Sequence, residues 1–275
     1  MERKKRLIIL GIILTCVLLI VVLSSALFSF KAVSVECRTN MFVINETDHQ
    51  KIIESGEFKY GKNILFLNFD KNIENIELKN PYVKVVNIER KFPNYAIINI
   101  KERMPVVKLN ANGGTYILDE ELKVLNFVKT TSDYNVTLNE DKLPNLIIDA
   151  DANLDYIKDK KAGEFLENEE LKCIVSSFYN GVVTTEEIDG EKLAKSCITT
   201  IKDITVSYEP TSRFKCLKYT LTFEGSNSTA IIYDDSEDGL TDNIYKTFKM
   251  FVDYEDKYIQ FICRNGELTG IEKNS

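Results

Sequence analysis

The feature that most constrains this chain is a long apolar segment near its start. Leu7 to Phe30 runs 24 residues without a charged side chain. A helix of that length is about 36 Å long, at about 1.5 Å per residue, and can cross a hydrocarbon core of about 30 Å. The basic run Arg3–Arg6 precedes it, and such flanks stay in the cytoplasm. The sequence therefore predicts a cytoplasmic tail (1–6), a transmembrane helix (7–30) in the lipid bilayer, and an outside remainder, which is single-pass type II topology at the cell membrane.

A cleaved signal peptide is the alternative interpretation of this segment. Ser24-Ser25-Ala26 offers small residues of the kind found at cleavage sites. The apolar core of a signal peptide usually runs about 7–15 residues, and Leu7 to Leu23 is already longer. We therefore expect the segment to be retained as an anchor.

Charge and cysteine content narrow the class of the outer part. The whole chain carries a net charge of −7, and because residues 1–30 carry +3, the remainder carries −10. Such an acidic domain argues against nucleic acid or anionic lipid as the main partner. The outer cysteines (Cys37, Cys173, Cys197, Cys216 and Cys263) are odd in number, dispersed and without a CxxC pair, and His49 is the only histidine. The sequence therefore predicts no metal site and no disulfide framework.

The first part of the outer region predicts a compact α+β unit. Lys31–Cys37 alternates like a half-buried strand, and Asn45–Gly56 and Asp70–Asn80 are typical of short helices, with Ile73, Ile76 and Leu78 inward. Tyr82–Arg90 and Tyr95–Arg103 are strand-like, and Lys91–Asn94 between them is typical of a hairpin turn. The predicted order is β-α-α-β-β over residues 31–104.

The second part, residues 105–275, predicts a mostly antiparallel β-domain with two helices. The helices are expected over Lys161–Tyr179 and Thr241–Phe251, and residues 149–164 and 184–195 are expected to be loops. Short strand candidates recur between turn signals: Val106–Leu109, Thr115–Asp119, Val124–Val128, Leu146–Ile148, Ile201–Tyr208, Cys216–Phe223, Thr229–Tyr233, Tyr258–Cys263 and Glu267–Ile271.

The segment Gly61–Pro105 resembles the FtsQ/DivIB family of bacterial cell-division proteins. The family pattern of a V-x-R-x-(F/W)-P strand end followed by an E-R-x-P strand end is carried here by six signature residues: Arg90, Phe92, Pro93, Glu102, Arg103 and Pro105. Tyr258–Ile271 is similar to the family's closing hairpin, with Gln260 where the family often has Asp.

This resemblance implies a POTRA domain, a following β-domain and a non-enzymatic scaffold of the divisome at the septum. The implied partners are two small membrane division proteins, FtsL-like and FtsB/DivIC-like. Neither catalysis nor a cofactor is expected.

Two other classes stay open. A sortase-like transpeptidase would also be membrane-anchored and β-rich and would use Cys, His and Arg. However, its Thr-Leu-x-Thr-Cys strand motif is missing here, and His49 is expected to be a solvated helix residue. A POTRA-bearing export or assembly factor would usually show tandem POTRA units or a long amphipathic barrel pattern.

The last hairpin is the predicted partner-binding site. No strand follows Glu267–Ile271 in the sequence, so this strand is expected to be a sheet edge with unpaired backbone groups. Such an edge can bind an extended segment of a partner as an added strand. The hypothesis assigns the docking surface to Phe261, Cys263, Gly266, Leu268 and Ile271. Elsewhere, Arg90 and Glu102 are expected to form a cross-strand pair.

Overall fold

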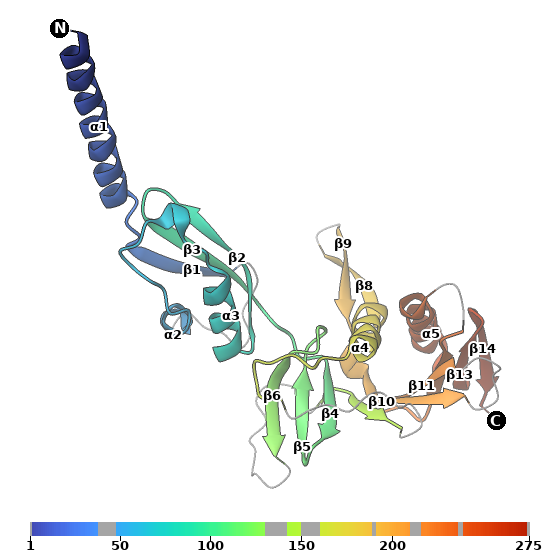
Figure 1. Ribbon diagram of the computed structural model, residues 1–275. Coiled ribbons are helices and arrows are strands. Elements are labelled where there is room, and N and C mark those ends of the chain that lie inside the picture. Colours follow the sequence, from blue (N-terminus) through green and yellow to red (C-terminus); the bar gives the residue numbers. More distant parts are fainter. Residues whose placement is uncertain are drawn as a thin grey trace. The chain divides into compact units, whose positions relative to one another are not determined.

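The computed structural model describes residues 2–37, 48–129, 142–149, 160–188, 191–209, 216–235 and 239–273. The chain forms two compact units, Met1–Arg103 and Met104–Ser275. Figure 1 shows the elements of each.

The apolar segment forms the helix α1 (Glu2–Leu27). Ile9–Leu27 is long and apolar enough to cross a membrane. The helix ends at Leu27, three residues before the end of the predicted segment 7–30. Phe30 instead packs into the folded unit and is only 1% exposed. Apolar side chains satisfy a membrane and a protein core equally well, so hydropathy alone could not place this boundary.

The first unit has the predicted β-α-α-β-β order: β1 (Ala32–Cys37), α2 (His49–Ser55), α3 (Asp70–Lys79), β2 (Val83–Lys91) and β3 (Tyr95–Glu102). The strand order is β1-β3-β2, with β3 parallel to β1 and antiparallel to β2. The start of the first predicted helix, residues 45–47, lies outside the described residues.

Side chains from both helices and all three strands build the core of this unit. Ile52 and Ile76 from the helices meet Val83, Ile98 and Ile100 from the sheet. The α3 helix begins where the Asn68 side chain accepts a hydrogen bond from the backbone N–H of Asp70, at 2.8 Å. Leu78, which the pattern predicts inward, is 45% exposed.

The second unit contains a nine-stranded sheet in the order β14-β13-β12-β11-β10-β7-β4-β5-β6. Most pairs are antiparallel, as predicted, while β7 is parallel to β4 and to β10, and β12 is parallel to β13. The strands are β4 (Val107–Ala111), β5 (Gly114–Leu118), β6 (Val124–Lys129), β7 (Asn145–Ile148), β10 (Ile201–Glu209), β11 (Cys216–Phe223), β12 (Thr229–Tyr233), β13 (Tyr258–Arg264) and β14 (Glu267–Glu272).

The short strand β7 lies between β10 and β4 and so joins the strands β10 to β14 to the strands β4 to β6. Only two residue pairs match β4 with β7, Lys108 with Asn145 and Leu109 with Leu146. One further backbone bond runs from Lys108 N–H to Pro144 O, at 2.9 Å.

Two helices pack with the sheet, α4 (Glu169–Gly181) and α5 (Leu240–Tyr254), and Figure 1 shows α5 beside β13 and β14. Their inward side chains, including Phe178, Ile244 and Phe248, join one core cluster with the strands.

The predicted start of α4 at Lys161 was wrong. The segment before Asn168 instead makes a turn at Lys161–Glu164 and runs beside the start of β6. The N–H of Gly163 bonds to Val124 O at 2.8 Å, and the N–H of Leu166 bonds to Leu122 O at 3.0 Å.

The predicted loop over 184–195 was also wrong. β8 (Val183–Ile188) and β9 (Glu191–Ser196) form a two-stranded antiparallel hairpin. Asp189-Gly190 stands between the two runs in the sequence, and Asp-Gly between strands is a strong hairpin signal.

Candidate partner-binding site

The hairpin β13–β14 forms one edge of the nine-stranded sheet. Within the described chain, β14 pairs only with β13. Asn265 and Gly266 join the strands, with φ values of 49° and 76°. A two-residue turn with both φ angles positive favours Asn-Gly and matches the twist of the flanking strands. The backbone N–H of Asn265 also donates to the Asp235 carboxylate at 2.7 Å, which fixes the turn.

The pairing register shows which backbone groups of β14 face outward. Arg264 and Glu267 flank the two-residue turn and form the first, hydrogen-bonded pair. Hydrogen-bonded and non-hydrogen-bonded pairs alternate along an antiparallel ladder. Leu268, opposite Cys263, and Gly270, opposite Phe261, are therefore in non-hydrogen-bonded pairs. Their N–H and C=O groups point away from β13, toward the open side of β14.

The five predicted docking residues do not share one surface. Phe261 and Cys263 are fully buried in the core, and Leu268 packs against the same core. Ile271 pairs with Gln260, one register step away from Phe261 and Gly270, so its side chain lies on the opposite face of the sheet. The buried Phe261 and Cys263 side chains therefore support the edge from within the core, and a docking role for the other predicted residues stays a prediction.

Aromatic packing holds this edge in place. The Phe261 ring meets the Phe251 ring of α5 edge-on, with centroids 5.7 Å apart, and meets the Tyr258 ring at 5.9 Å. The Tyr258 ring also covers Gly270, where an added Cβ would lie 2.7 Å from it. Only glycine therefore fits at position 270 while Tyr258 keeps this position.

Charged side chains stand at both ends of β14. Glu267 is exposed next to the turn, and Glu272 lies 3.4 Å from the Lys257 ammonium at the other end. The residues between them, Leu268 to Ile271, carry no charge. A strand added here would meet an uncharged stretch of backbone bounded by two carboxylates.

Burial raises the pKa of two titratable groups beside the turn, Asp234 and Cys216. Burial raises the pKa of Asp234, and the neighbouring Asp235 raises it further. Burial is also the main cause of the raised pKa of the Cys216 thiol, which Asp235 raises further. Arg264 lies against this group, 3.7 Å from the Asp235 carboxylate and over the Tyr233 ring at 4.6 Å.

The signature residue Arg90 supports a loop of the first unit. Its Nε donates to Ile64 O at 3.1 Å, its Nη2 donates to Leu67 O at 2.5 Å, and its guanidinium lies 5.1 Å from the Phe69 ring. The predicted pair of Arg90 with Glu102 is wrong. The hairpin register places Arg90 opposite Ala96, at the far end of the sheet from Glu102.

Phe92 and Pro93 form the β2–β3 turn, where the Phe92–Pro93 peptide bond is cis. The Phe92 side chain is 60% exposed and meets the Phe28 ring edge-on, with centroids 6.0 Å apart.

Glu102 and Arg103 are both buried at the end of β3. The Arg103 Nη2 lies 3.0 Å from the Glu77 Oε2, and Glu77 Oε1 accepts a bond from the backbone N–H of Val85 at 2.8 Å. Pro105 follows in the second unit and is partly exposed. The buried signature residues are therefore structural supports.

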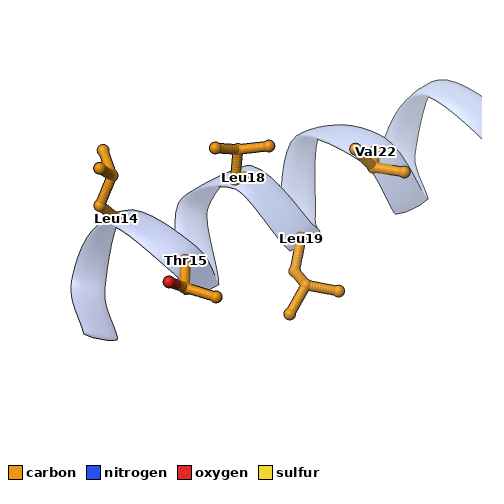
Figure 2. A pocket seen from close by; sticks show the side chains of 5 residues that line it. All are labelled: Leu14, Thr15, Leu18, Leu19 and Val22. Carbon is orange, nitrogen blue, oxygen red and sulfur yellow. The ribbon is translucent and has the colours of Figure 1, made fainter. Parts of the chain in front are cut away.

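Among the described residues, no group of three or more His, Cys, Asp or Glu side chains is placed to hold a metal ion. Figure 2 shows a groove on α1 lined by Leu14, Thr15, Leu18, Leu19 and Val22. Its one polar side-chain group, the Thr15 hydroxyl, donates to Gly11 O at 2.9 Å. The groove is a feature of the apolar helix surface and carries no catalytic group.

Comparison with known protein families identifies the first unit. Residues 42–103 match the POTRA domain of FtsQ type. The match confirms the resemblance drawn from Gly61–Pro105. No curated protein matches the chain.

Proposed function

We propose that this chain, which carries an FtsQ-type POTRA domain behind an apolar helix, is a non-enzymatic scaffold of the bacterial division machinery. It recruits FtsB/DivIC-like and FtsL-like membrane proteins to the septum. The FtsQ-type POTRA family is generally non-enzymatic, which supports a binding role.

The observation that carries the proposal is the open edge at β14. Leu268 and Gly270 offer outward N–H and C=O groups to an extended segment, which supplies affinity through main-chain bonds. Thr269 and Ile271 present side chains on the outer face and Leu268 on the helix side, which supplies specificity. The site is thus the β14 edge from Leu268 to Ile271.

The basic residues at the start of α1 support a type II orientation. Arg3 to Arg6 precede the apolar segment, and the positive-inside rule keeps such residues in the cytoplasm. Both folded units then lie outside the membrane, where the outer parts of other division proteins are available.

A proline at position 268 tests the edge directly. Leu268→Pro removes one outward N–H without removing a bond to β13, and edge strands tolerate proline at such positions. Leu268→Ala is the matched control, because it also removes the leucine side chain but keeps the N–H. Without the N–H at position 268, one carbonyl of the bound partner segment would be buried without a hydrogen bond. This costs about 1–3 kcal/mol of binding free energy.

We therefore expect Leu268→Pro to weaken capture of an FtsB/DivIC-like ectodomain by about fivefold to a hundredfold relative to Leu268→Ala. The measurement is titration of the full chain in nanodiscs with that ectodomain. Equal affinity of the two variants would remove the edge from the proposal. A fluorescent fusion of the full chain tests the cellular role separately, since a division scaffold gives a ring at midcell and a uniform membrane label contradicts it.

A further inference from the structure

We propose that the end of the POTRA domain beside α1 is a membrane-contacting surface that inserts into the lipid headgroup layer. We name it the membrane collar and define it by Phe28, Tyr60, Leu65, Phe66 and Phe92. The inference depends on α1 crossing a bilayer and does not depend on the division role.

The collar surrounds the point where the chain leaves α1. The C=O of Phe28, one residue beyond the helix, accepts a bond from Ile64 N–H at 2.8 Å. The N–H of Phe30 bonds to Lys62 O, and the C=O of Phe30 accepts from Gly61 N–H, both at 2.8 Å. The Phe92 ring contacts the Phe28 ring. Figure 1 shows the β2–β3 turn beside the end of α1. No linker therefore separates the apolar helix from the domain.

The length of the span sets the depth of the collar. Ile9–Leu27 has 19 residues, which is about 28 Å of helix at about 1.5 Å per residue and matches a hydrocarbon core of about 30 Å. Leu27 then lies at the hydrocarbon boundary. The headgroup layer beyond it is about 5–8 Å thick. Phe28 falls within this layer, and so do the Phe92 ring that contacts it and the turn at Ile64 that is hydrogen-bonded to it.

The exposed side chains of the collar fit that environment. Phe66 is 85% exposed, Leu65 and Tyr60 are also exposed, and Phe92 projects from the neighbouring turn. Tyr60 stacks on the buried Phe30 ring, with centroids 5.2 Å apart, so it is held at the same place. Large aromatic side chains left in water lose hydrophobic free energy, whereas aromatic residues are enriched at membrane interfaces.

The charge of the collar agrees with a lipid surface. Its three segments, residues 28–31, 59–66 and 91–94, contain Lys31, Lys59, Lys62 and Lys91 and no acidic residue, although Lys91 is paired with Glu89 of β2 at 2.6 Å. This local excess of lysine stands in a region whose net charge is −10. Lysine side chains can lie along apolar surface and reach anionic headgroups, each adding attraction. The combination of exposed aromatic rings and lysines favours an anionic bilayer over an acidic or apolar protein as the occupant.

Tryptophan scanning tests the collar, because the chain contains no tryptophan and each variant is a single reporter. We would place Phe66→Trp and Phe92→Trp separately in the full chain, reconstituted into vesicles of phosphatidylcholine and phosphatidylglycerol. Leu78→Trp is the matched control. It is an exposed position of the same domain, next to the opposite end of β2, and the nine residues of β2 place that end about 26 Å away, at about 3.3 Å per residue.

Brominated lipids should quench the collar variants and spare the control. We expect at least about a twofold loss of emission for Phe66→Trp and Phe92→Trp and less than about a tenth for Leu78→Trp, since only the first two lie within the headgroup layer. Equal, weak quenching of all three variants would overturn the proposal. So would blue-shifted emission of the collar variants without lipid quenching, which indicates a protein contact instead. A chain that does not float with the vesicles would overturn the anchor and the collar together, whereas loss of midcell localisation would leave both intact.

Discussion

The buried ion pair between Glu77 and Arg103 allows a quantitative test of how the POTRA domain is held together. The Arg103 side chain is 4% exposed and the Glu77 side chain 16% exposed, with their charged atoms 3.0 Å apart. Glu77 lies on α3, Arg103 follows β3, and Glu77 also accepts a bond from Val85 on β2. The pair therefore connects the helix to both strands of the hairpin.

Removing one partner should be costly because it leaves the other charge buried. Glu77→Leu removes the carboxylate beside the buried Arg103 guanidinium and breaks the bond from Val85 N–H. Breaking a buried pair in this way costs about 3–5 kcal/mol. Small domains are stable by about 5–15 kcal/mol in total, so the first unit should lose a large share of its stability. The double variant Glu77→Leu with Arg103→Met replaces both charges by apolar groups, and we expect it to recover at least about 2 kcal/mol of the loss.

Native-state hydrogen exchange of the full chain in detergent is the suitable assay. Peptides from β2 and β3 report opening of the first unit alone, which matters because a chain of two units need not unfold in one transition. Glu57→Gln is the control, since it removes an ion pair to Lys79 at 2.6 Å in the same unit with both side chains exposed. Surface pairs of this kind contribute little, so we expect no resolved change for the control.

The reasoning is refuted if Glu77→Leu changes the opening free energy of β2 and β3 no more than Glu57→Gln does. It is also refuted if the double variant is as unstable as the sum of the single variants, because the loss of the carboxylate beside the buried Arg103 charge would then not be the cause.

Three further outcomes follow from the packing. Gly181→Ala places a Cβ 2.7 Å from Ile244 and should destabilise the second unit by about 1–3 kcal/mol, measured by hydrogen exchange of α4 and α5. Phe30→Ala empties a buried aromatic site and should cost the first unit about 3–5 kcal/mol in the same assay. Because the pKa of Asp234 is raised in the folded state, its contribution to stability is greatest below its ordinary pKa and falls as pH rises through the raised value. Asp234→Asn should therefore stabilise the second unit at neutral pH and flatten its pH dependence; unchanged exchange of β11 and β12 would contradict this.

Local patterns were enough to predict most elements, but their ends depend on contacts that the sequence does not display. The helical spacing of Phe165 and Leu166 extended the predicted helix back to Lys161. In the structure, α4 begins after Asn168, whose side chain accepts a bond from Leu171 N–H at 2.8 Å. Leu166 still reaches the core, from extended chain beside Leu122 and Val124. Burial of a leucine therefore does not specify the backbone that delivers it.

The candidate site was predictable as an edge strand but not as a surface. A closing hairpin with an Asn-Gly turn was read correctly from the sequence. Which side chains stay accessible depends on the helix above the strands, because Phe251 of α5 covers Phe261. The error over Arg90 was avoidable, because a turn from Lys91 to Tyr95 forces Arg90 toward Ala96 and never toward Glu102.

The narrow join at β7 has a mechanical consequence for the second unit. The POTRA domain continues at Met104 into β4, while the open edge lies at β14, and β7 stands between these strands in the sheet order. Tension between a tethered domain and a captured partner must pass through that join. Two matched residue pairs resist separation of β4 from β7, whereas eight pairs join β10 to β11. Under a pulling force the sheet should therefore separate first between β4 and β7, where the fewest residue pairs hold two neighbouring strands together.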